Sequence, residues 1–324
     1  MNVLITGGAG FLGLQLARLL LQRGTLNLDG QAIAFDRLTL LDVVAPQGLD
    51  DARVRVVTGD LSDPAVLRQA IDQDTGAVFH LAAVVSGQAE ADFELGMRVN
   101  LDASRALLET CRELGHKPRV LFTSSVAVYG GELPPVVQDD TALNPQSSYG
   151  VQKAIGELLL SDYSRRGFVD GRVLRLPTIS VRPGKPNAAA SSFASGIIRE
   201  PLAGVAANCP VAPDTKLWLL SPRAAVAALV NGIELAGERL GNRRVVNLPG
   251  LSVTAAGMVD ALRRVAGDAV ADRVTWEREG RVEKIVGTWP AAWNAERALS
   301  LGFESDASFD AVIRAYMEDA GVGK

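Results

Sequence analysis

Residues 2–13 read NVLITGGAGFLG, and this stretch decides the fold class of the chain. Residues 2–6 form a short aliphatic and β-branched run, which is typical of a buried strand. Glycines then occupy four of the seven positions from 7 to 13, and helical periodicity follows over residues 14–23. A strand, a glycine-rich turn and a helix in this order predict the opening of a dinucleotide-binding βαβ unit.

The glycines of this turn have distinct physical roles in that prediction. Gly7 permits the tight turn off the strand, Gly10 lets the backbone approach a pyrophosphate, and Gly13 lets helix and sheet pack closely. The anion would rest on amide groups at the start of the helix, and Phe11 and Leu12 are predicted to contact the same cofactor. A flexible turn is the alternative, which the position between strand and helix disfavours.

Strands alternate with helices over roughly the first 170 residues, which predicts an α/β fold: a Rossmann-type doubly wound parallel sheet with a smaller C-terminal region. We assign residues 1–176 to the dinucleotide-binding domain, with residues 222–250 returning to it. Residues 177–221 and 251–324 are expected to form the substrate-binding region. Residues 24–36 are expected to be a loop, with a short strand as the alternative.

Composition excludes several classes of protein. The chain has 324 residues, and 33 Lys+Arg against 37 Asp+Glu give a net charge of −4, which argues against electrostatic binding of nucleic acid. Two histidines and two cysteines are too few for a His/Cys metal centre or a disulfide scaffold, whereas a carboxylate-bound magnesium is not excluded. Neither a signal peptide nor a membrane-spanning stretch is recognisable. We therefore expect a cytoplasmic enzyme with no metal, no nucleic-acid partner and no membrane segment.

Two aspartates follow strands at one edge of the predicted sheet. Asp42 ends the second main strand, where a carboxylate accepts hydrogen bonds from the adenosine ribose and repels a 2′-phosphate. This residue favours NAD over NADP as the cofactor. Asp60 follows the third strand, within reach of an adenine amino group. An ordinary turn aspartate is the alternative for each of them.

A further motif combines Tyr149, Lys153 and Ser125. Tyrosine and lysine four residues apart lie on one face of a helix. Free tyrosine has a pKa near ~10 and is a poor base at neutral pH, but a nearby ammonium lowers that pKa. Ser125, at the end of a neighbouring strand, is placed to hold a substrate hydroxyl against the Tyr149 oxygen. A solvated helix face is the alternative for such a pair, and the preceding nucleotide fingerprint disfavours it.

Together these motifs resemble those of the extended short-chain dehydrogenases/reductases. The residues that carry the resemblance are TGGAGFLG (6–13), Asp60, HLAA (80–83), Asn100, Ser124–Ser125 before VAVYG, and YGVQK (149–153). The resemblance implies that Tyr149 is the acid/base, that Lys153 holds the nicotinamide ribose and that Ser125 orients the substrate. It also implies further NAD contacts at Leu61, Leu81, Ala82, Ala83, Asn100, Thr123 and Pro177. A homodimer formed through two long helices, predicted at residues 93–113 and 148–166, is implied as well.

Two segments depart from the nucleotide-sugar branch of this family. Where those enzymes commonly carry Arg-Tyr-Phe-Asn after the sixth strand, this chain reads RLPT at 175–178. Where they carry a stretch like Arg-Asp-Tyr-Ile-His-Val-Asp-Asp, it reads WLLSPRA at 218–224. The chain is more similar to an NAD-dependent branch that acts on short, erythronate-like sugar acids. We therefore predict oxidation of the C2 hydroxyl of a short aldonate to the 2-oxo acid, with Tyr149 as the base and NAD as the hydride acceptor.

A short sugar acid requires a carboxylate clamp rather than a diphosphate site. Arg182 and Arg223 are the candidate clamps, because a guanidinium binds a carboxylate through two hydrogen bonds. Ser86 and Thr178 are further candidate substrate contacts. Surface ion pairs are the alternative for the arginines, and an ordinary loop hydroxyl is the alternative for Ser86.

Other activities stay open at this point. A nucleotide-sugar epimerase or dehydratase would keep its NAD tightly bound and release no net NADH. An enzyme resembling L-threonine dehydrogenase shares the small carboxylate substrate. A non-catalytic NAD-binding regulator is a different class, and the retained Tyr149–Lys153 pair disfavours it. His80, Cys111 and Trp289 are interpreted as packing residues, with a place in the substrate pocket as the alternative for Trp289.

Overall fold

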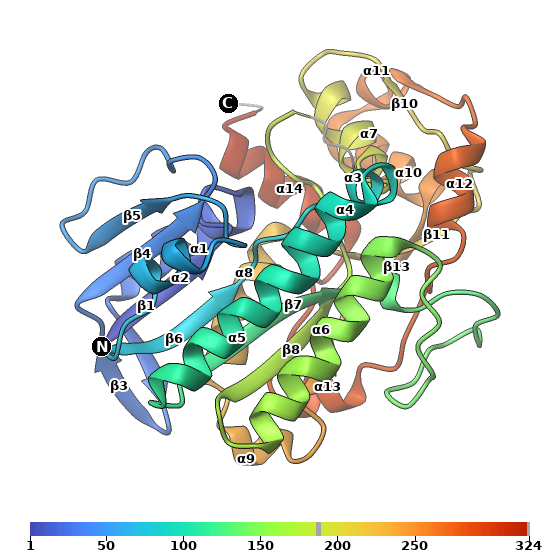
Figure 1. Ribbon diagram of the computed structural model, residues 1–324. Coiled ribbons are helices and arrows are strands. Elements are labelled where there is room, and N and C mark those ends of the chain that lie inside the picture. The colour runs from blue at the N-terminus through green and yellow to red at the C-terminus, as the bar shows by residue number, and fades with distance from the viewer. Residues whose placement is uncertain (186–188, 323–324) are drawn as a thin grey trace.

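Seven parallel strands form the central sheet of the protein, seen in a computed structural model that describes residues 1–185 and 189–322 (Figure 1). The strands are β1 (Asn2–Thr6), β4 (Arg37–Asp42), β5 (Val54–Thr58), β6 (Thr75–His80), β7 (Arg119–Ser125), β8 (Asp170–Leu176) and β12 (Val245–Asn247). Their order is β12-β8-β7-β6-β1-β4-β5, and all neighbours are parallel. The predicted doubly wound α/β fold is confirmed. Because the strand order reverses between β1 and β6, a ligand crevice is expected at their carboxyl ends.

Helices cover both faces of this sheet. Figure 1 shows α5 (Ala103–Leu114) and α6 (Ser148–Arg165) side by side on one face, on which α2 (Pro64–Ala70) also packs. The other face carries α1 (Phe11–Arg23) and α8 (Pro222–Glu234). The central strands β1, β6 and β7 therefore have no solvated face, which is why they read as largely apolar runs in the sequence, whereas the edge strand β5 keeps exposed residues.

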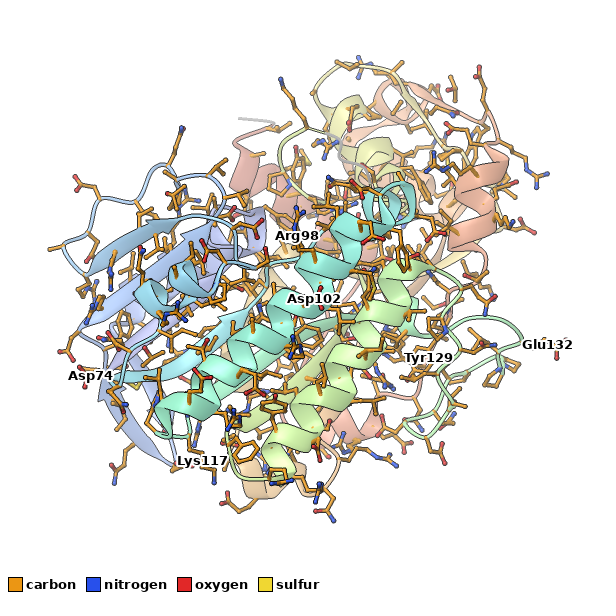
Figure 2. All side chains as sticks on the ribbon, viewed as in Figure 1. Asp74, Arg98, Asp102, Lys117, Tyr129 and Glu132 are labelled. Atoms are coloured by element: carbon orange, nitrogen blue, oxygen red, sulfur yellow. The ribbon has the colours of Figure 1, made fainter. Side chains whose placement is uncertain are left out.

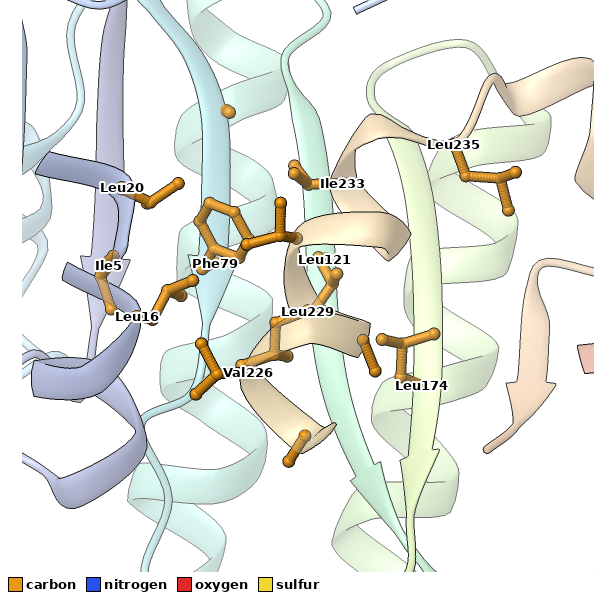
Figure 3. Close-up of a cluster of buried hydrophobic side chains, with 14 of the residues drawn as sticks. Ile5, Leu16, Leu20, Phe79, Leu121, Leu174, Val226, Leu229, Ile233 and Leu235 are labelled. Atoms are coloured by element: carbon orange, nitrogen blue, oxygen red, sulfur yellow. The ribbon is translucent and has the colours of Figure 1, made fainter. Parts of the chain in front are cut away.

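The largest apolar cluster lies between the sheet and the pair α1 and α8. Figure 3 shows Ile5, Phe79 and Leu121 of three strands facing Leu16 of α1 and Leu229 of α8. All five side chains are fully buried. Burial of each side chain of this kind contributes about 1.5–3 kcal/mol to stability. This cluster fixes α1, and with it the glycine turn, against the carboxyl end of β1.

The glycine turn requires its glycines for steric reasons. Gly7 has a φ of +73°, and a Cβ on Gly13 would lie 2.2 Å from the Gly7 carbonyl oxygen. Helix α1 begins at Phe11, earlier than the periodicity predicted, with Gly10 as its N-cap. Among the described residues, no side chain caps this helix start and its first turn carries no acidic residue. The start of α1 therefore presents amide groups to an anion.

Two segments differ in detail from the sequence-based expectation. Residues 24–36, expected to be a loop, contain an antiparallel hairpin of β2 (Thr25–Leu28) and β3 (Gln31–Ala34). The Asp-Gly pair at its turn is the sequence signal for this structure. The long helix predicted at 93–113 consists of α4 (Phe93–Gly96), a π-helical turn (Met97–Asp102) and α5.

The C-terminal part of the chain builds a smaller layer beside the strand ends. Its sheet contains β9 (Thr178–Ile179), β11 (Lys216–Leu220) and β13 (Leu251–Thr254), and its main helices are α7 (Phe193–Leu202), α10 (Ala255–Ala266) and α14 (Phe309–Ala320). The N-terminal half also contains two short elements, α3 (Ser86–Ala91) and a 3₁₀ turn (Val126–Val128). The short elements after residue 200 are β10 (Ala207–Asn208), α9 (Gly237–Leu240), α11 (Asp268–Ala271), β14 (Val274–Thr275), α12 (Gly280–Val286) and α13 (Glu296–Ser300). This layer has an apolar cluster of its own. Residues 186–188 and 323–324 of the predicted substrate-binding region lie outside the described residues. No helix within the described ranges is long and apolar enough to cross a membrane.

Candidate active site

A cavity of about 640 Å³ opens at the carboxyl ends of the central strands, between the sheet and the C-terminal layer. The predicted cofactor residues that line it are Gly7, Gly10, Phe11, Leu12, Gly13, Asp42, Asp60, Leu61, Leu81, Ala82, Ala83, Thr123, Tyr149, Lys153 and Pro177. The predicted substrate residues that line it are Ser86, Ser125, Tyr149, Thr178 and Arg182. Residues from distant parts of the sequence therefore meet in one cavity at the point where the strand order reverses.

One end of the cavity carries two aspartates. The Asp42 carboxylate accepts backbone hydrogen bonds from Ala9 at 2.9 Å and from Val43 at 2.7 Å. Asp60 accepts hydrogen bonds from the amide of Ser62 at 2.8 Å and from its hydroxyl at 2.7 Å. The backbone hydrogen bond from Ser62 holds the pKa of Asp60 below its ordinary value, so this carboxylate is ionised at neutral pH. The two carboxylates at this end of the cavity can accept hydrogen bonds from hydroxyl and amino groups of a ligand, and they repel phosphate.

The residues present fit a nicotinamide dinucleotide. The uncapped start of α1 suits a pyrophosphate, and the acidic end suits an adenosine without a 2′-phosphate. A side chain at position 7 has no room, because a Cβ there would lie 2.9 Å from the Ala82 amide nitrogen. The backbone of the turn is thus bare where a pyrophosphate would approach.

Asn100, predicted to contact the cofactor, lies behind the cavity wall instead. Its side chain is buried, accepts a hydrogen bond from the Val84 amide at 2.8 Å and donates to the Val84 carbonyl at 3.1 Å. It also donates to Gln152 at 2.7 Å. Asn100 therefore ties the loop after β6 to α6, and it reaches the cavity only through that loop.

Ser125, Tyr149 and Lys153 come together as predicted from their spacing. Ser125 ends β7, and its hydroxyl accepts a hydrogen bond from the Ala127 amide at 3.2 Å and is near enough to the Tyr149 phenol to lower its pKa. Lys153 is buried, and its Nζ donates to the carbonyl of Thr123 at 2.8 Å and lies 5.7 Å from the centroid of the Tyr149 ring. Gly150 permits this approach of α6, since a Cβ there would lie 2.1 Å from the carbonyl oxygen of Ala127.

Burial controls the protonation of this group. Burial raises the pKa of Tyr149 to about 12, while the nearby Ser125 hydroxyl and the charge of Arg182 lower it. Burial lowers the pKa of Lys153 to about 7, and the negative charge of Glu157 opposes that change. The sequence predicted that Lys153 lowers the pKa of Tyr149. In the structure the loss of hydration outweighs the charges that lower this pKa, and Arg182 is a further cation that acts on the phenol.

Arg182 lies at the substrate end of the cavity. Its backbone amide donates to the hydroxyl of Ser195 at 3.0 Å, and its carbonyl accepts a hydrogen bond from Arg199 at 2.8 Å. Its Nη2 atom is buried and has no hydrogen-bond partner among the residues that the structure describes. Burial, with the charge of Arg199, lowers the pKa of Arg182 to about 10, so it remains a cation at neutral pH. Arg182 is partly buried, lines the cavity and carries a donor without a partner among the described residues, so it is a candidate for binding an anion.

Arg223 does not lie in this cavity, which corrects the prediction that it clamps the substrate. It is on the first turn of α8 and donates to Asp319 at 2.5 and 3.0 Å and to Glu318 at 3.0 Å. These partners are on α14, and the arginine lines a separate, smaller depression. The surface ion pair, which was the alternative, is the arrangement observed.

The cavity is also lined by residues not assigned to it from the sequence, and by Trp289, for which a place in the pocket was the alternative. Arg98 lies 3.8 Å from Asp60, and Figure 2 shows it on the helical segment between α4 and α5. Gln88, Ser191 and Trp289 complete the substrate end. Trp289 therefore takes its alternative role as a pocket residue. No motif marks these positions, because the tertiary packing alone brings their segments to the cavity.

The two residues interpreted as packing residues are buried, and their pKa values are far from the catalytic range. His80 bonds to the hydroxyls of Thr6 and Ser104, and burial lowers its pKa to about 3. Burial raises the pKa of the Cys111 thiol to about 12. Within residues 1–185 and 189–322, no group of three or more His, Cys, Asp or Glu side chains is arranged to hold a metal ion.

Comparison with known proteins agrees with this geometry. Residues 3–216 match the NAD dependent epimerase/dehydratase family. The chain belongs to this family. It is 94% identical to D-erythronate dehydrogenase of Cupriavidus necator over 324 residues, which is 100% of both chains. It is 46% identical to D-erythronate dehydrogenase of Haemophilus influenzae over 98% of this chain and 99% of the relative.

A solved structure has nearly the same fold as this chain. It is described as the nucleoside-diphosphate-sugar epimerase from Agrobacterium tumefaciens and is 43% identical to this chain. The TM-score is 0.92, and the match covers 100% of this chain and 95% of that one. The family match and the two full-length relatives show that this protein is an NAD-dependent oxidoreductase that acts on a CH–OH group.

Proposed function

We propose that this enzyme oxidises the C2 hydroxyl of a short sugar acid of the D-erythronate kind to the 2-oxo acid, with NAD as the hydride acceptor. The observation that carries the proposal is the pairing, in one cavity, of Ser125 and Tyr149 with the open, partly buried guanidinium of Arg182. A hydroxyl-oxidising group and a carboxylate-binding group at one site match a hydroxy acid. Full-length identity of 94% to D-erythronate dehydrogenase supports this choice of substrate.

Binding of the substrate is assigned to the end of the cavity beside Arg182. The Nη2 donor of Arg182 would take the carboxylate, and Ser86 and Thr178 offer hydroxyls to the remaining polyol. Ser86 is held in place, because its hydroxyl accepts a hydrogen bond from the Ala190 amide at 3.3 Å. The positive charge of Arg182 attracts the anion and also favours the phenolate of Tyr149.

Proton transfer is assigned to Tyr149. Ser125 holds the C2 hydroxyl against the phenol oxygen, and Tyr149 as phenolate takes the hydroxyl proton. The bound cofactor supplies the hydride acceptor and, in its oxidised form, a positive charge. Lys153 holds its position through the Thr123 carbonyl and is assigned to the ribose. Burial raises the pKa of Tyr149 and so opposes the phenolate, whereas the positive charges of Arg182 and of the oxidised nicotinamide favour it.

The experiment that tests the function is a substrate panel read at the NADH absorbance band. Purified protein with NAD is offered aldonates of four to six carbons, UDP-sugars and L-threonine. Rapid NADH formation with erythronate, and little with the others, is the expected result. NADH formed only with threonine would assign the threonine activity instead. Epimerised UDP-sugar without net NADH would assign the epimerase activity.

Replacement of Arg182 tests the carboxylate clamp. Arg182→Met is expected to raise KM for the sugar acid by roughly 10–100-fold, with a smaller change in kcat, because a charge-assisted hydrogen bond is lost. Steady-state kinetics with saturating NAD provide the measurement. Arg223→Met is the matched control, since Arg223 is held by Asp319 outside the cavity and should leave KM unchanged. The reverse pattern would show that the clamp has been assigned to the wrong arginine.

The homodimer is proposed through the outer surface of α5 and α6. On α6, Leu158 is 68% exposed and Val151 is 41% exposed. These positions are seven residues apart and therefore lie on one face of the helix. We expect Leu158→Lys to shift the mass measured by light scattering from dimer to monomer, because it places a charge in an apolar contact. A wild-type mass of one chain at micromolar concentration would rule the dimer out.

A further inference from the structure

Two charged side chains that the proposed reaction does not use are buried behind the cavity. Glu157 of α6 is 2% exposed and Arg175 of β8 is 8% exposed. Arg175 donates from Nε to Glu157 Oε1 at 2.8 Å and from Nη2 to Oε2 at 2.6 Å. This is a bidentate pair in the interior, where removing two ions from water is costly. Stability alone is a weak reason for such a pair.

Glu157 is also bonded to the strand that carries Ser125. The hydroxyl of Ser124 donates to Glu157 Oε1 at 2.5 Å, and Ser124 is the register neighbour of Arg175 across β7 and β8. One turn earlier on α6, Lys153 donates to the carbonyl of Thr123. Two successive turns of α6 thus hold two successive residues of β7. The next residue of the strand is Ser125.

Lys153 lies near the negative charge of Glu157. On its own helix it faces Glu157, one turn later, and the neutral Tyr149. His80 of β6 is near enough to feel the lysine charge and is itself neutral at neutral pH. Arg175 of β8 lies beyond Glu157, and its Nη1 donates to the Tyr129 hydroxyl at 2.5 Å. Figure 2 shows Tyr129 beside α6.

We propose that Glu157 is a positioning residue: held by Arg175 and Ser124, it fixes the end of β7 and keeps Lys153 positively charged inside an apolar site. Arg175 moderates this effect, because it neutralises much of the Glu157 charge. Together the two residues set the charge that Lys153 presents to the cofactor and to Tyr149. This inference rests on the proposed function, in which Lys153 acts as an ammonium.

Removing the charge of Glu157 and removing the charge of Arg175 are expected to shift the titration midpoint of Lys153 in opposite directions. Glu157→Gln removes the anion and should lower the titration midpoint of Lys153 by about one pH unit, and Arg175→Met should raise it by a similar amount. The double variant should return to within about half a unit of the wild type. The measurement is an NMR titration of isotopically labelled lysine side chains in cofactor-free protein. Lys153 is assigned by the signal that is lost in Lys153→Met.

Arg172→Met is the matched control for burial. Arg172 is on the same strand as Arg175 and is 1% exposed, but it pairs with Asp170 at the opposite end of β8. This variant should lose stability without moving the Lys153 midpoint. Glu157→Asp keeps the charge and should keep the midpoint even where folding is weakened. If both single variants leave the midpoint unchanged, or move it in the same direction, the charge-setting role is wrong.

Ser124→Ala tests the positioning half without removing a charge. We expect kcat to fall about tenfold, because the anchor next to Ser125 is lost, while KM and NAD affinity stay within about twofold. An unchanged kcat would overturn the proposed role of Glu157 and Ser124 in positioning the end of β7. The NMR titration needs neither substrate nor cofactor, so its outcome is independent of which substrate the enzyme uses. Failure of every sugar acid in the substrate panel would therefore reject the proposed function alone.

Discussion

Replacing Tyr149 by phenylalanine is expected to reduce kcat for NAD-dependent oxidation by about 10²–10⁴-fold, the usual contribution of a positioned acid/base. The phenylalanine ring fills the same volume at the first turn of α6, so the cavity keeps its shape. Only the phenol oxygen near Ser125 is removed. Without it no group at that position accepts the hydroxyl proton as hydride leaves C2.

The affinity for NAD should change little in this variant. The residues assigned to the pyrophosphate and the adenosine are at the start of α1 and at Asp42, on the other side of the cavity from the phenol. Tyr163→Phe is the control, because Tyr163 is on the same helix and bonds to Glu109 outside the cavity. Steady-state rates at the NADH band and calorimetric titration with NAD measure the two quantities. Full activity of Tyr149→Phe would remove Tyr149 from the mechanism.

The fold and the reactive centre were predictable because their signals are local. The apolar run at residues 2–6 and the glycines after it require one strand, one turn and one helix in sequence. The spacing of Tyr149 and Lys153 requires only that the segment be helical, and Ser147 caps that helix through the Gly150 amide. Each of these predictions uses about two dozen consecutive residues or fewer.

The substrate end was not predictable in the same way. Arg182 and Arg223 look equivalent in the sequence, and what separates them is tertiary packing. The partner of Arg223 is Asp319, 96 residues later, whereas one guanidinium nitrogen of Arg182 finds no partner among the described residues. The spacing of Tyr149 and Lys153 likewise gives no measure of burial. Burial is what raises the pKa of the phenol rather than lowering it.

Lys153→Met is expected to make the protein more stable and nearly inactive. Burial lowers the pKa of Lys153 from 10.5 to about 7, so the folded protein at pH 7 has lost much of the hydration that this ammonium has in the unfolded chain. Methionine fills a similar volume without that cost. The lost hydrogen bond to Thr123 offsets part of the gain. We expect a net increase of about 1–3 kcal/mol in the free energy of unfolding at pH 7.

The pH dependence gives this prediction its sign. Between pH 7 and 10.5 the unfolded chain keeps the lysine proton while the folded protein releases it. Stability of the wild type therefore rises with pH in that window, by up to about 1.4 kcal/mol per pH unit. The variant lacks this contribution. The excess of its free energy of unfolding over that of the wild type should be largest at pH 7 and below, and should shrink toward pH 10.

Denaturant unfolding of both proteins at pH 7 and pH 9.5 tests the argument, with Lys216→Met as the control for an exposed lysine. The activity should move the opposite way. Without the ammonium, kcat/KM is expected to fall by about 10²-fold or more and the NAD dissociation constant to rise. A buried charge that costs stability and is required for turnover is the signature of a functional residue. If Lys153→Met were both less stable at pH 7 and fully active, Lys153 would be a structural residue, and the proposed centre would reduce to Ser125 and Tyr149.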